Sequence, residues 1–246
     1  MHRNTIAYVI VAALFGFISG FWLANSINRS AVSSLGIQKT STNSASTNSA
    51  VAAAEPDLSD AELNSKIAEA DKNPANFAFQ KDLGISLYRY AAMKQDNKLL
   101  GEAARILDRA NSLNAKDFDV LVALGNAHFD IGFAKKDAAS FQTAREVYAK
   151  ALDIKPADAD VMTDLGLTYF LQNPPAYDKA ATELQKVADA NPKHERSLQF
   201  LVQTYVKQNK TAEAEKAFAK LKTINPNNSA IQELNALISS QTGTVK

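Results

Sequence analysis

Residues 195–228 read ERSLQFLVQTYVKQNKTAEAEKAFAKLKTINPNN, and the rest of the chain can be understood from this stretch. Its first half carries Leu201 and Tyr205 one helical turn apart, and its second half carries Ala214, Phe218 and Leu221 with the same kind of spacing. The run ends at Pro226, which has no amide hydrogen and cannot continue a helix. The stretch therefore predicts two helices followed by a stop.

The same pattern occurs three more times toward the N-terminus. Pro74, Pro156 and Pro192 stand at points comparable to Pro226, and Ala115 takes the place of a proline in the remaining copy. Each copy has a leucine and a glycine, or Leu201-Val202, in its first helix, and a small alanine near the start of its second. The matched positions are Gly84, Gly125, Gly166 and Val202; then Leu87, His128, Tyr169 and Tyr205; then Ala103, Ala144, Ala180 and Ala214; and finally Leu107, Tyr148, Leu184 and Phe218.

This pattern resembles the tetratricopeptide repeat (TPR), a helix–turn–helix unit of about 34 residues. In such a unit glycine and alanine let two helices approach closely, and larger side chains fill the remaining gaps. One pair cannot bury its apolar face alone, so pairs must stack. The resemblance covers residues 77–228 and implies an all-α solenoid of about four repeats, at residues 77–117, 118–158, 159–194 and 195–228.

Two further helices are expected to close the ends of the stack. Residues 57–72 have Ser59 as an N-cap and Glu62 completing a capping box. Residues 229–240 form an apolar stripe and predict a closing helix; the stripe consists of Ile231, Leu234, Leu237 and Ile238. The repeat domain is thus expected to span residues 57–240, followed by a tail at 241–246.

The first two copies are longer than the last. Each carries about seven extra residues between its helices, near AMKQDNKLLG (residues 92–101) and GFAKKDAASF (residues 132–141), and the third carries about two near residues 172–180. Longer turns would accommodate these residues, and so would helices extended by about two turns. The sequence leaves both arrangements open.

The N-terminal part has a different composition. After a short tail at residues 1–4, residues 5–24 (TIAYVIVAALFGFISGFWLA) are uncharged and would span roughly 30 Å as a helix, the thickness of a membrane's hydrocarbon core. We expect a retained transmembrane signal-anchor; a signal peptide cleaved after Ser26 is the alternative. Gly16 and Gly20 form a small-xxx-small face that could support a homodimer. Residues 25–56, rich in Ser, Asn, Thr and Ala, predict a flexible linker.

The charges around this segment give the expected topology. The tail before it is short and no basic cluster follows it, which favours a cytoplasmic N-terminus and an exported repeat domain. The chain is therefore expected in the bacterial inner membrane as a single-pass protein with its repeats in the periplasm.

Composition and motifs argue against several classes of function. The 27 basic and 26 acidic residues nearly cancel, so no global field attracts nucleic acid. Without cysteine there is no disulfide, thiolate zinc site or cysteine nucleophile. HExxH, Gly-rich phosphate loops and GxSxG are absent. The acids Asp153, Asp158, Asp160 and Asp164 lack the glycine and glutamate of a calcium loop and are interpreted as helix N-terminal residues. No enzyme, cofactor or metal is predicted.

The resemblance implies that the first helices of the repeats line a concave groove. Tyr88, Phe129 and Phe170 occupy equivalent places and would form an aromatic row, or would pack against neighbouring helices. Lys81 and Asn126 suit a carboxylate clamp, but other expected polar positions are apolar or small, so such a clamp is not predicted. The groove candidates are Lys81, Ile85, Tyr88, Arg89, Asp119, Val122, Asn126, Phe129, Asp130, Asp160, Thr163, Leu167, Phe170, Leu171, Arg196, Gln199, Gln203, Val206 and Lys207.

The stretch ALGNAHFDIG (residues 123–132) looks at first like a catalytic cluster. The repeat register separates its members, because His128 falls in the slot of Leu87, Tyr169 and Tyr205 and is predicted to be a packed ring. Asn126 is predicted to face the groove instead.

The whole arrangement is similar to membrane-anchored periplasmic TPR proteins of the cytochrome c maturation type, which hold apocytochrome segments. The phrases ALGNAHFD and DVMTDLGLTYF carry this finer likeness. It implies a membrane-anchored scaffold that binds a protein or peptide partner through its groove. A self-associating envelope scaffold without groove binding is the alternative.

Overall fold

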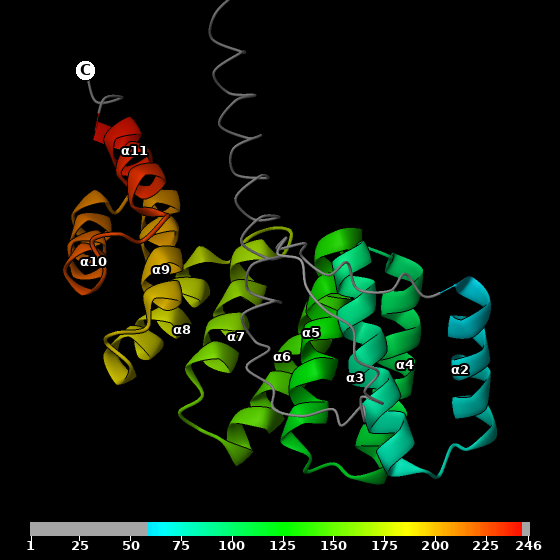
Figure 1. Ribbon diagram of the computed structural model, residues 1–246. Helices are drawn as coiled ribbons and strands as arrows, with labels where there is room; N and C mark the ends of the chain where they lie inside the picture. Colours follow the sequence, from blue (N-terminus) through cyan, green and yellow to red (C-terminus); the bar gives the residue numbers. More distant parts are fainter. Residues whose placement is uncertain (1–58, 243–246) are drawn as a thin grey trace, which may run out of the picture. The chain divides into compact units, whose positions relative to one another are not determined.

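The computed structural model describes residues 59–242, and all regular structure in this range is helical (Figure 1). Contacts divide the chain into residues 1–69 and 70–246, which are described separately. The all-α solenoid expected from the sequence is confirmed for the described residues. The helices are α2 (Asp60–Lys72), α3 (Phe77–Lys94), α4 (Asn97–Leu113), α5 (Phe118–Lys135), α6 (Ala138–Ile154), α7 (Ala159–Leu171), α8 (Tyr177–Ala190), α9 (Glu195–Lys207), α10 (Thr211–Ile224) and α11 (Ile231–Thr242).

The start of α2 has the predicted capping box. The Ser59 amide donates to Glu62 Oε2 at 3.0 Å, and the Glu62 amide donates to Ser59 Oγ at 3.3 Å. These reciprocal bonds satisfy amide groups that the first turn of a helix leaves without partners. The hydrogen bonds from the Ser59 hydroxyl and amide also lower the pKa of Glu62.

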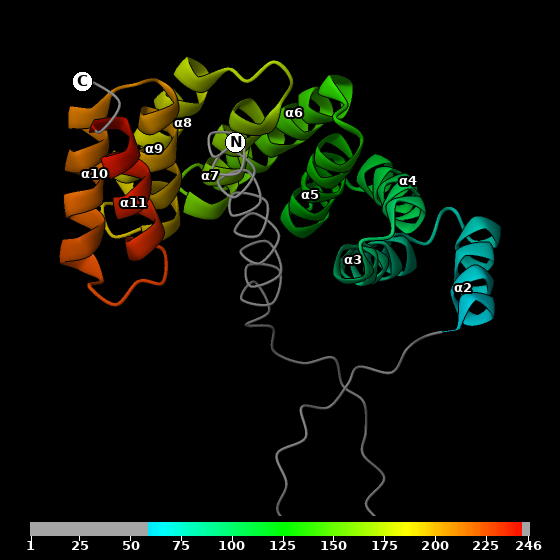
Figure 2. The same cartoon turned by 90° about the horizontal axis from the view of Figure 1, so that it is seen from above.

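Helices α3 to α10 form four antiparallel pairs, α3–α4, α5–α6, α7–α8 and α9–α10 (Figures 1 and 2). Each second helix also contacts the first helix of the next pair, and the first helices α3, α5, α7 and α9 contact one another in sequence. Helix α11 lies against α9 and α10, where Leu234 and Ile238 are buried. It covers apolar surface that would otherwise end the stack.

Glycine allows close approach inside three of the four pairs. A Cβ atom added at Gly84 would lie 2.8 Å from Leu107 Cγ, and one at Gly125 would lie 2.5 Å from Tyr148 Cε1. At Gly166 the distance to Leu184 would be 3.0 Å. The partners are fully buried and come from the alanine-rich second helix, as the sequence pattern predicts.

The extra residues of the first two repeats lengthen the helices. Helices α3 and α5 have 18 residues each, whereas α7 and α9 have 13. The turns stay short because Gln95 and Lys136 adopt left-handed backbone conformations with φ of 55° and 54°. Asp96 and Asp137 follow at once and cap α4 and α6, each accepting from two backbone amides. Of the two arrangements that the sequence left open, the chain therefore has the longer helices.

Several predicted segments lie outside the described residues. These are the tail at residues 1–4, the anchor at 5–24 with Gly16 and Gly20, and the linker at 25–56. Within residues 59–242, no helix combines the length and apolar character needed to cross a membrane.

Candidate partner-binding face of the first helices

The slot that contains His128 joins consecutive repeats. His128 Nε2 lies 3.9 Å from Asp108 Oδ2 on α4. In the next repeat the Arg145 guanidinium of α6 lies over the Tyr169 ring, 4.7 Å from its centroid. The Tyr205 hydroxyl donates to Gln185 Oε1 on α8 at 3.1 Å. His128, Tyr169 and Tyr205 thus each contact the second helix of the preceding repeat, and the packing role predicted for His128 is confirmed.

Burial governs the titration of His128. It lowers the pKa of the imidazole, and the nearby Asp108 carboxylate offsets only part of this effect. Desolvation raises the pKa of Asp108, opposed by the charges of His128 and Lys150. The ring is therefore held neutral at neutral pH, which suits packing between helices better than proton transfer.

A second set of side chains links three of the four first helices, α3, α7 and α9, to the segment at the start of the next repeat or of α11. Lys81 Nζ donates to both oxygens of Asp117 at 2.9 and 2.8 Å. The corresponding Thr163 Oγ1 lies 3.5 Å from His194 Nδ1. Gln199 Nε2 donates to Asn228 Oδ1 at 2.9 Å. Lys81, Thr163 and Gln199 are among the predicted groove candidates, and their side chains contact the segment that follows the next helix-pair boundary.

The junction between the first and second repeats is an ion-pair cluster. Lys81 Nζ also lies 3.1 Å from Asp119 Oδ2, and this carboxylate keeps 67% of its side chain exposed. Burial acts to lower the pKa of Lys81, but the hydrogen bonds and charges of Asp117 and Asp119 outweigh it, so the pKa is raised. Burial likewise acts to raise the pKa of Asp117, but Lys81 and backbone amides lower it overall.

The junction between the third and fourth repeats has a similar cluster, but here the cation belongs to the later repeat and the carboxylates belong to the earlier one. Arg196 on α9 pairs with Asp164 on α7, and both side chains are nearly buried, at 12% and 6% exposure. Asp160 Oδ1 lies 3.6 Å from Arg196 and 3.5 Å from His194 Nε2, with 54% of its side chain exposed. One cation therefore serves two carboxylates here as well.

Two rings of the predicted aromatic row, Phe129 and Phe170, take part in helix packing. Phe129 meets Phe141 of α6 edge-on at 5.6 Å between centroids. Phe170 meets Tyr177 at 5.4 Å and Phe200 at 6.3 Å. Asn126 accepts a 2.8 Å hydrogen bond from the buried Tyr148 hydroxyl. The other side chains divide by exposure: Lys81, Ile85, Tyr88, Val122, Leu171 and Arg196 are half-buried, Arg89, Asp119, Asp160 and Lys207 are exposed, and Asp130, Thr163, Leu167, Gln199, Gln203 and Val206 are buried.

Two buried amides on α9 keep unused hydrogen-bonding groups. Gln199 Oε1 and Gln203 Nε2 have no hydrogen-bond partner among the described residues, although these residues are only 5% and 3% exposed. They lie one turn apart and share a stripe of α9 with Arg196. Polar groups buried without partners are rare in proteins, so this stripe of α9 differs from an ordinary protein interior, in which such groups are hydrogen-bonded.

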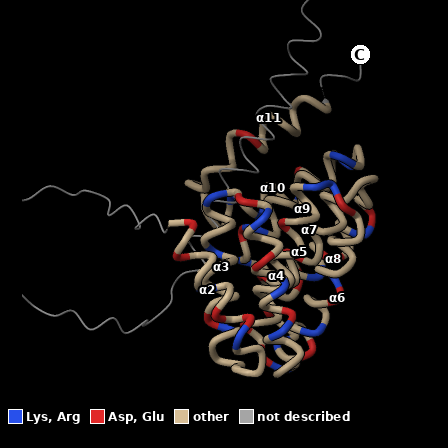
Figure 3. Tube along the Cα trace, turned by 90° about the vertical axis from the view of Figure 1, so that its right-hand side faces the viewer, with Lys and Arg blue, Asp and Glu red and all other residues tan. Residues whose placement is uncertain are grey.

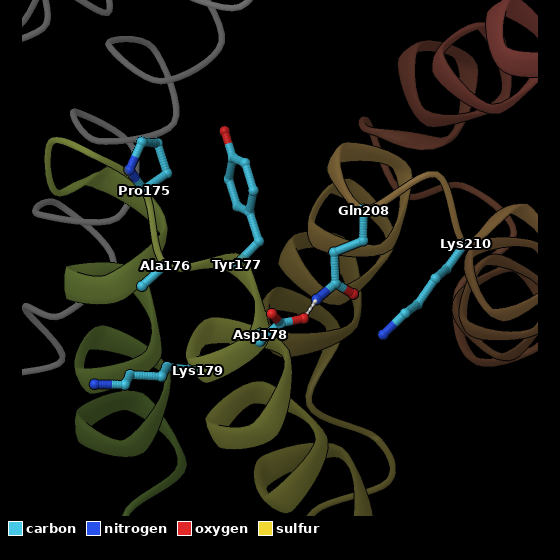
Figure 4. Close-up of a pocket in the computed structure, with 7 residues that line it drawn as sticks. All are labelled: Pro175, Ala176, Tyr177, Asp178, Lys179, Gln208 and Lys210. Atoms are coloured by element: carbon cyan, nitrogen blue, oxygen red, sulfur yellow. Dashed lines mark hydrogen bonds between the residues drawn. The ribbon is translucent and has the colours of Figure 1, made fainter.

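A separate cavity of about 480 Å³ lies between the start of α8 and the α9–α10 turn (Figure 4). Inside it, Gln208 Nε2 donates to Asp178 Oδ1 at 2.7 Å, and burial raises the pKa of Tyr177. The sequence did not predict this cavity; the two prolines of NPPAYDKA were the one local signal of an irregular turn. The lining residues are Pro175, Ala176, Tyr177, Asp178, Lys179, Gln208 and Lys210.

The four acids considered as metal ligands have other positions. Asp158 caps α7 by accepting from the Val161 amide at 3.0 Å, and Asp160 and Asp164 face Arg196. Asp153 is exposed near the end of α6. Over residues 59–242 no three His, Asp or Glu side chains are grouped as a metal ion would require.

Comparisons with known proteins agree with the geometry. Residues 176–238 match the family model for the tetratricopeptide repeat. No curated protein sequence matches the chain.

Solved structures resemble a larger part of the chain. MamA AMB-1 is 26% identical with a TM-score of 0.51, covering 67% of this chain and 88% of that one. MamA 41-end from Desulfovibrio magneticus RS-1 is 19% identical with a TM-score of 0.54, covering 69% and 86%. TTC0263, a thermophilic TPR protein in Thermus thermophilus, is 18% identical with a TM-score of 0.51, covering 74% and 90%. By sequence, residues 176–238 match the tetratricopeptide repeat, and by fold the larger part of the chain resembles solved structures that include a TPR protein.

Proposed function

We propose that this chain is a scaffold that holds a segment of a partner protein along one face of its first helices. This first-helix face consists of residues at three positions of the repeat: Asp119, Asp160 and Arg196; then Lys81, Val122 and Gln199, three residues later in the register; and Gln203, four residues after Gln199. The TPR fold is a protein-interaction fold, and proteins of this fold generally act as scaffolds, so we also propose a role without catalysis.

The observation that carries the proposal is the pair of unfilled amide groups on α9. Gln199 Oε1 can accept one hydrogen bond and Gln203 Nε2 can donate one, and neither has a partner among the described residues. Leaving a buried polar group unpaired costs about 1–3 kcal/mol. An approaching main chain offers both an N–H donor and a C=O acceptor, so a rotation of the two side chains toward it would recover both hydrogen bonds.

We further propose that the scaffold is anchored in a bacterial inner membrane with its repeats in the periplasm. The uncharged segment at residues 5–24 and the polar linker at residues 25–56 support this proposal. A partner segment would then be held within reach of the membrane surface. Cytochrome c maturation is one process of this kind, supported by the architectural resemblance.

Site-specific photo-crosslinking in membranes tests the proposal. A photoreactive residue at Gln203 should crosslink to a partner segment that mass spectrometry can identify, whereas one at the exposed Lys220 of α10 should not. The identified segment, made as a synthetic peptide, should bind the full chain and lose affinity in Gln203→Met, which keeps the side-chain length but removes the donor.

Two results would contradict the proposal. Equal crosslinking from Gln203 and Lys220 would mean that the first-helix face is not selective. Crosslinks from Gln203 to a second copy of this chain alone would support the self-associating scaffold instead.

A further inference from the structure

We propose that the partner segment carries a Lys or Arg side chain that is held between α9 and α11, with Glu233 as its counter-ion. This inference rests on the proposed function, because it names one residue of the segment that occupies the first-helix face. Three observations carry it: the place of Glu233 in the repeat register, its burial without a cation, and the unfilled carbonyl oxygen of Gln199 at the same junction.

Helix α11 stands in the place of a further first helix. The Asn228 amide donates to the Asn225 carbonyl at 3.1 Å in the turn before α11, as the His194 amide donates to the Asn191 carbonyl at 2.9 Å before α9. Helix α11 then contacts α9 and α10, just as α9 contacts α7 and α8. The first-helix face therefore continues onto α11.

Glu233 has on α11 the position that Gln199 has on α9 and Lys81 has on α3. In those two repeats this position bonds to the start of the following helix, Lys81 to Asp117 and Gln199 to Asn228. No further helix follows α11 among the described residues, and Glu233 has no hydrogen bond or ion pair with them. Its carboxylate is half-buried and is the single side-chain charge of α11 (Figure 3).

Burial disfavours the charged form of this carboxylate. It raises the pKa of Glu233, and no neighbouring charge among the described residues opposes the effect. Burial also raises the pKa of Asp108, but there the charges of His128 and Lys150 offset part of the effect. A carboxylate that loses water without gaining a cation is destabilised, so Glu233 would be stabilised by a cation from a partner.

The cations along the first helices do not neutralise Glu233. Lys81 and Arg196 are engaged by carboxylates of their own junctions. Arg89 lies on α3, at the opposite end of the stack from α11 (Figure 2). Lys207 is exposed in the last turn of α9, and its charge does not lower the pKa of Glu233. The cation that pairs with Glu233 would therefore come from the partner.

The unpaired carbonyl oxygen of Gln199 gives a second indication of a cationic ligand. Gln199 Nε2 donates to Asn228 Oδ1 at 2.9 Å near the start of α11, which leaves Oε1 as an acceptor with no partner among the described residues. Gln199 is only 5% exposed. An ammonium or guanidinium group has several N–H donors, so it can donate to the Glu233 carboxylate and to Gln199 Oε1 together. Gln203 Nε2 remains as a donor for a main-chain carbonyl of the same segment.

Peptide binding to the full-length chain tests the inference. Three labelled peptides would share the same apolar residues and carry Lys, Nε-acetyl-lysine or Glu at one central position. Fluorescence anisotropy at low salt should give about tenfold tighter binding for the Lys peptide than for the acetyl-lysine peptide, and the Glu peptide should bind most weakly. Glu233→Gln keeps the shape of the side chain and removes its charge. It should weaken the Lys peptide about tenfold and leave the acetyl-lysine peptide unchanged.

Two further variants serve as controls. Glu215→Gln removes an exposed acid of α10 and should leave the affinities of all three peptides unchanged. Lys207→Gln should change the affinity of the Lys peptide by less than about twofold, because Lys207 is exposed and screened by salt. A gain in Lys207→Gln as large as the loss in Glu233→Gln would mean that Lys207 itself competes for Glu233, and it would overturn the inference.

The outcomes separate this inference from the proposed function. If the Lys and acetyl-lysine peptides bind equally and both lose affinity in Gln203→Met, the face holds peptides without regard to charge, and the inference is overturned while the proposed function stands. If the Lys peptide binds more tightly but Glu233→Gln leaves its affinity unchanged, its cation lies elsewhere and the inference also fails. If none of the peptides binds, the inference fails, and the photo-crosslinked segment alone decides the proposed function.

Discussion

His128 illustrates how much of a residue's role follows from its place in the repeat. Its slot predicted a packed ring, and the ring lies against α4 beside Asp108. The sequence could not predict the partner, because equivalent slots meet different side chains: Arg145 faces Tyr169 and Gln185 faces Tyr205. Asp108 and Gln185 stand one residue after the matched Leu107 and Leu184, whereas Arg145 stands three residues before the matched Tyr148, so the repeat pattern alone does not determine the contact.

Folding stability should depend on the protonation of His128. Burial lowers its pKa below the usual 6.5, so between the folded-state pKa and 6.5 the unfolded chain binds the proton more tightly. The His128 contribution is therefore fully present above pH 6.5 and is lost as the pH falls through this window. Urea unfolding at pH 7.5 and 5.5 should show a smaller pH-dependent loss in His128→Tyr than in the wild type. An equal loss in both would show that other groups cause it; Asp108 titrates in the opposite sense because its pKa is raised.

Gly125 should tolerate no side chain. A Cβ atom would lie 2.5 Å from Tyr148 Cε1, and this tyrosine is fully buried with its hydroxyl bonded to Asn126. Overpacking of this kind costs about 1–3 kcal/mol, so Gly125→Ala should lower the free energy of unfolding by that amount. Gly101, where nothing lies within 4 Å of an added Cβ, is the matched control. Gly101→Ala should gain about 0.5–1 kcal/mol because alanine favours a helix; a loss in both variants would argue against the packing explanation.

At the scale of the helix, the sequence predicted which helices exist and in which order they follow, but it left the lengths of the first helices undecided. The pattern placed an insertion near residues 92–101 and 132–141 but did not distinguish a turn from added helix. The outcome depends on Asp96 and Asp137, which cap the second helices directly after a single left-handed residue. The sequence also left undecided whether the aromatic row lines the groove or packs between helices. Helical periodicity places Phe129 and Phe170 on one side of each helix, but the stacked neighbours determine whether that side is covered.

The cap of α6 should carry part of the stability of the second repeat. Asp137 accepts from the Ala139 and Ser140 amides at 3.2 and 3.0 Å. Losing such a cap costs about 1 kcal/mol, so Asp137→Ala should lower the free energy of unfolding by that amount in urea titrations. Asp137→Asn keeps an acceptor and should retain most of the stability. If Asn and Ala are equally destabilising, the charge of Asp137 rather than its hydrogen bonds is what matters.

At the scale of the whole molecule, the sequence predicted a stack that needs closed ends. Leu234 and Ile238 of α11 are 1% and 6% exposed, so this helix shields apolar surface of the last repeat. The sequence could not predict the cavity beside Tyr177, because it is formed by two turns that belong to different repeats.

Weakening α11 should therefore destabilise the array from its C-terminal end. Leu234→Ala removes a buried leucine side chain and should lower the free energy of unfolding in urea by about 2–5 kcal/mol. Relative to the wild type, amide exchange should accelerate more in α9 and α10 than in α3 and α4. Gln232→Ala, at an exposed position of the same helix, should change stability little. Uniformly faster exchange throughout residues 70–242 would indicate that the repeats unfold only as a whole.

The side chains at the starts of the helices have a consequence for cooperativity. Asp117 caps α5 through the Val120 amide and also holds Lys81, and His194 caps α9 through the Ser197 amide while it lies beside Thr163. One residue thus both begins a helix and ties it to the preceding repeat. If a repeat unfolds, the capping residue of the next helix loses its contact with that repeat. The first turn of the next helix is then less stable, so unfolding of one repeat destabilises its neighbour. Val122 interrupts this series, so we expect this kind of coupling to be weaker between the second and third repeats than at the other junctions.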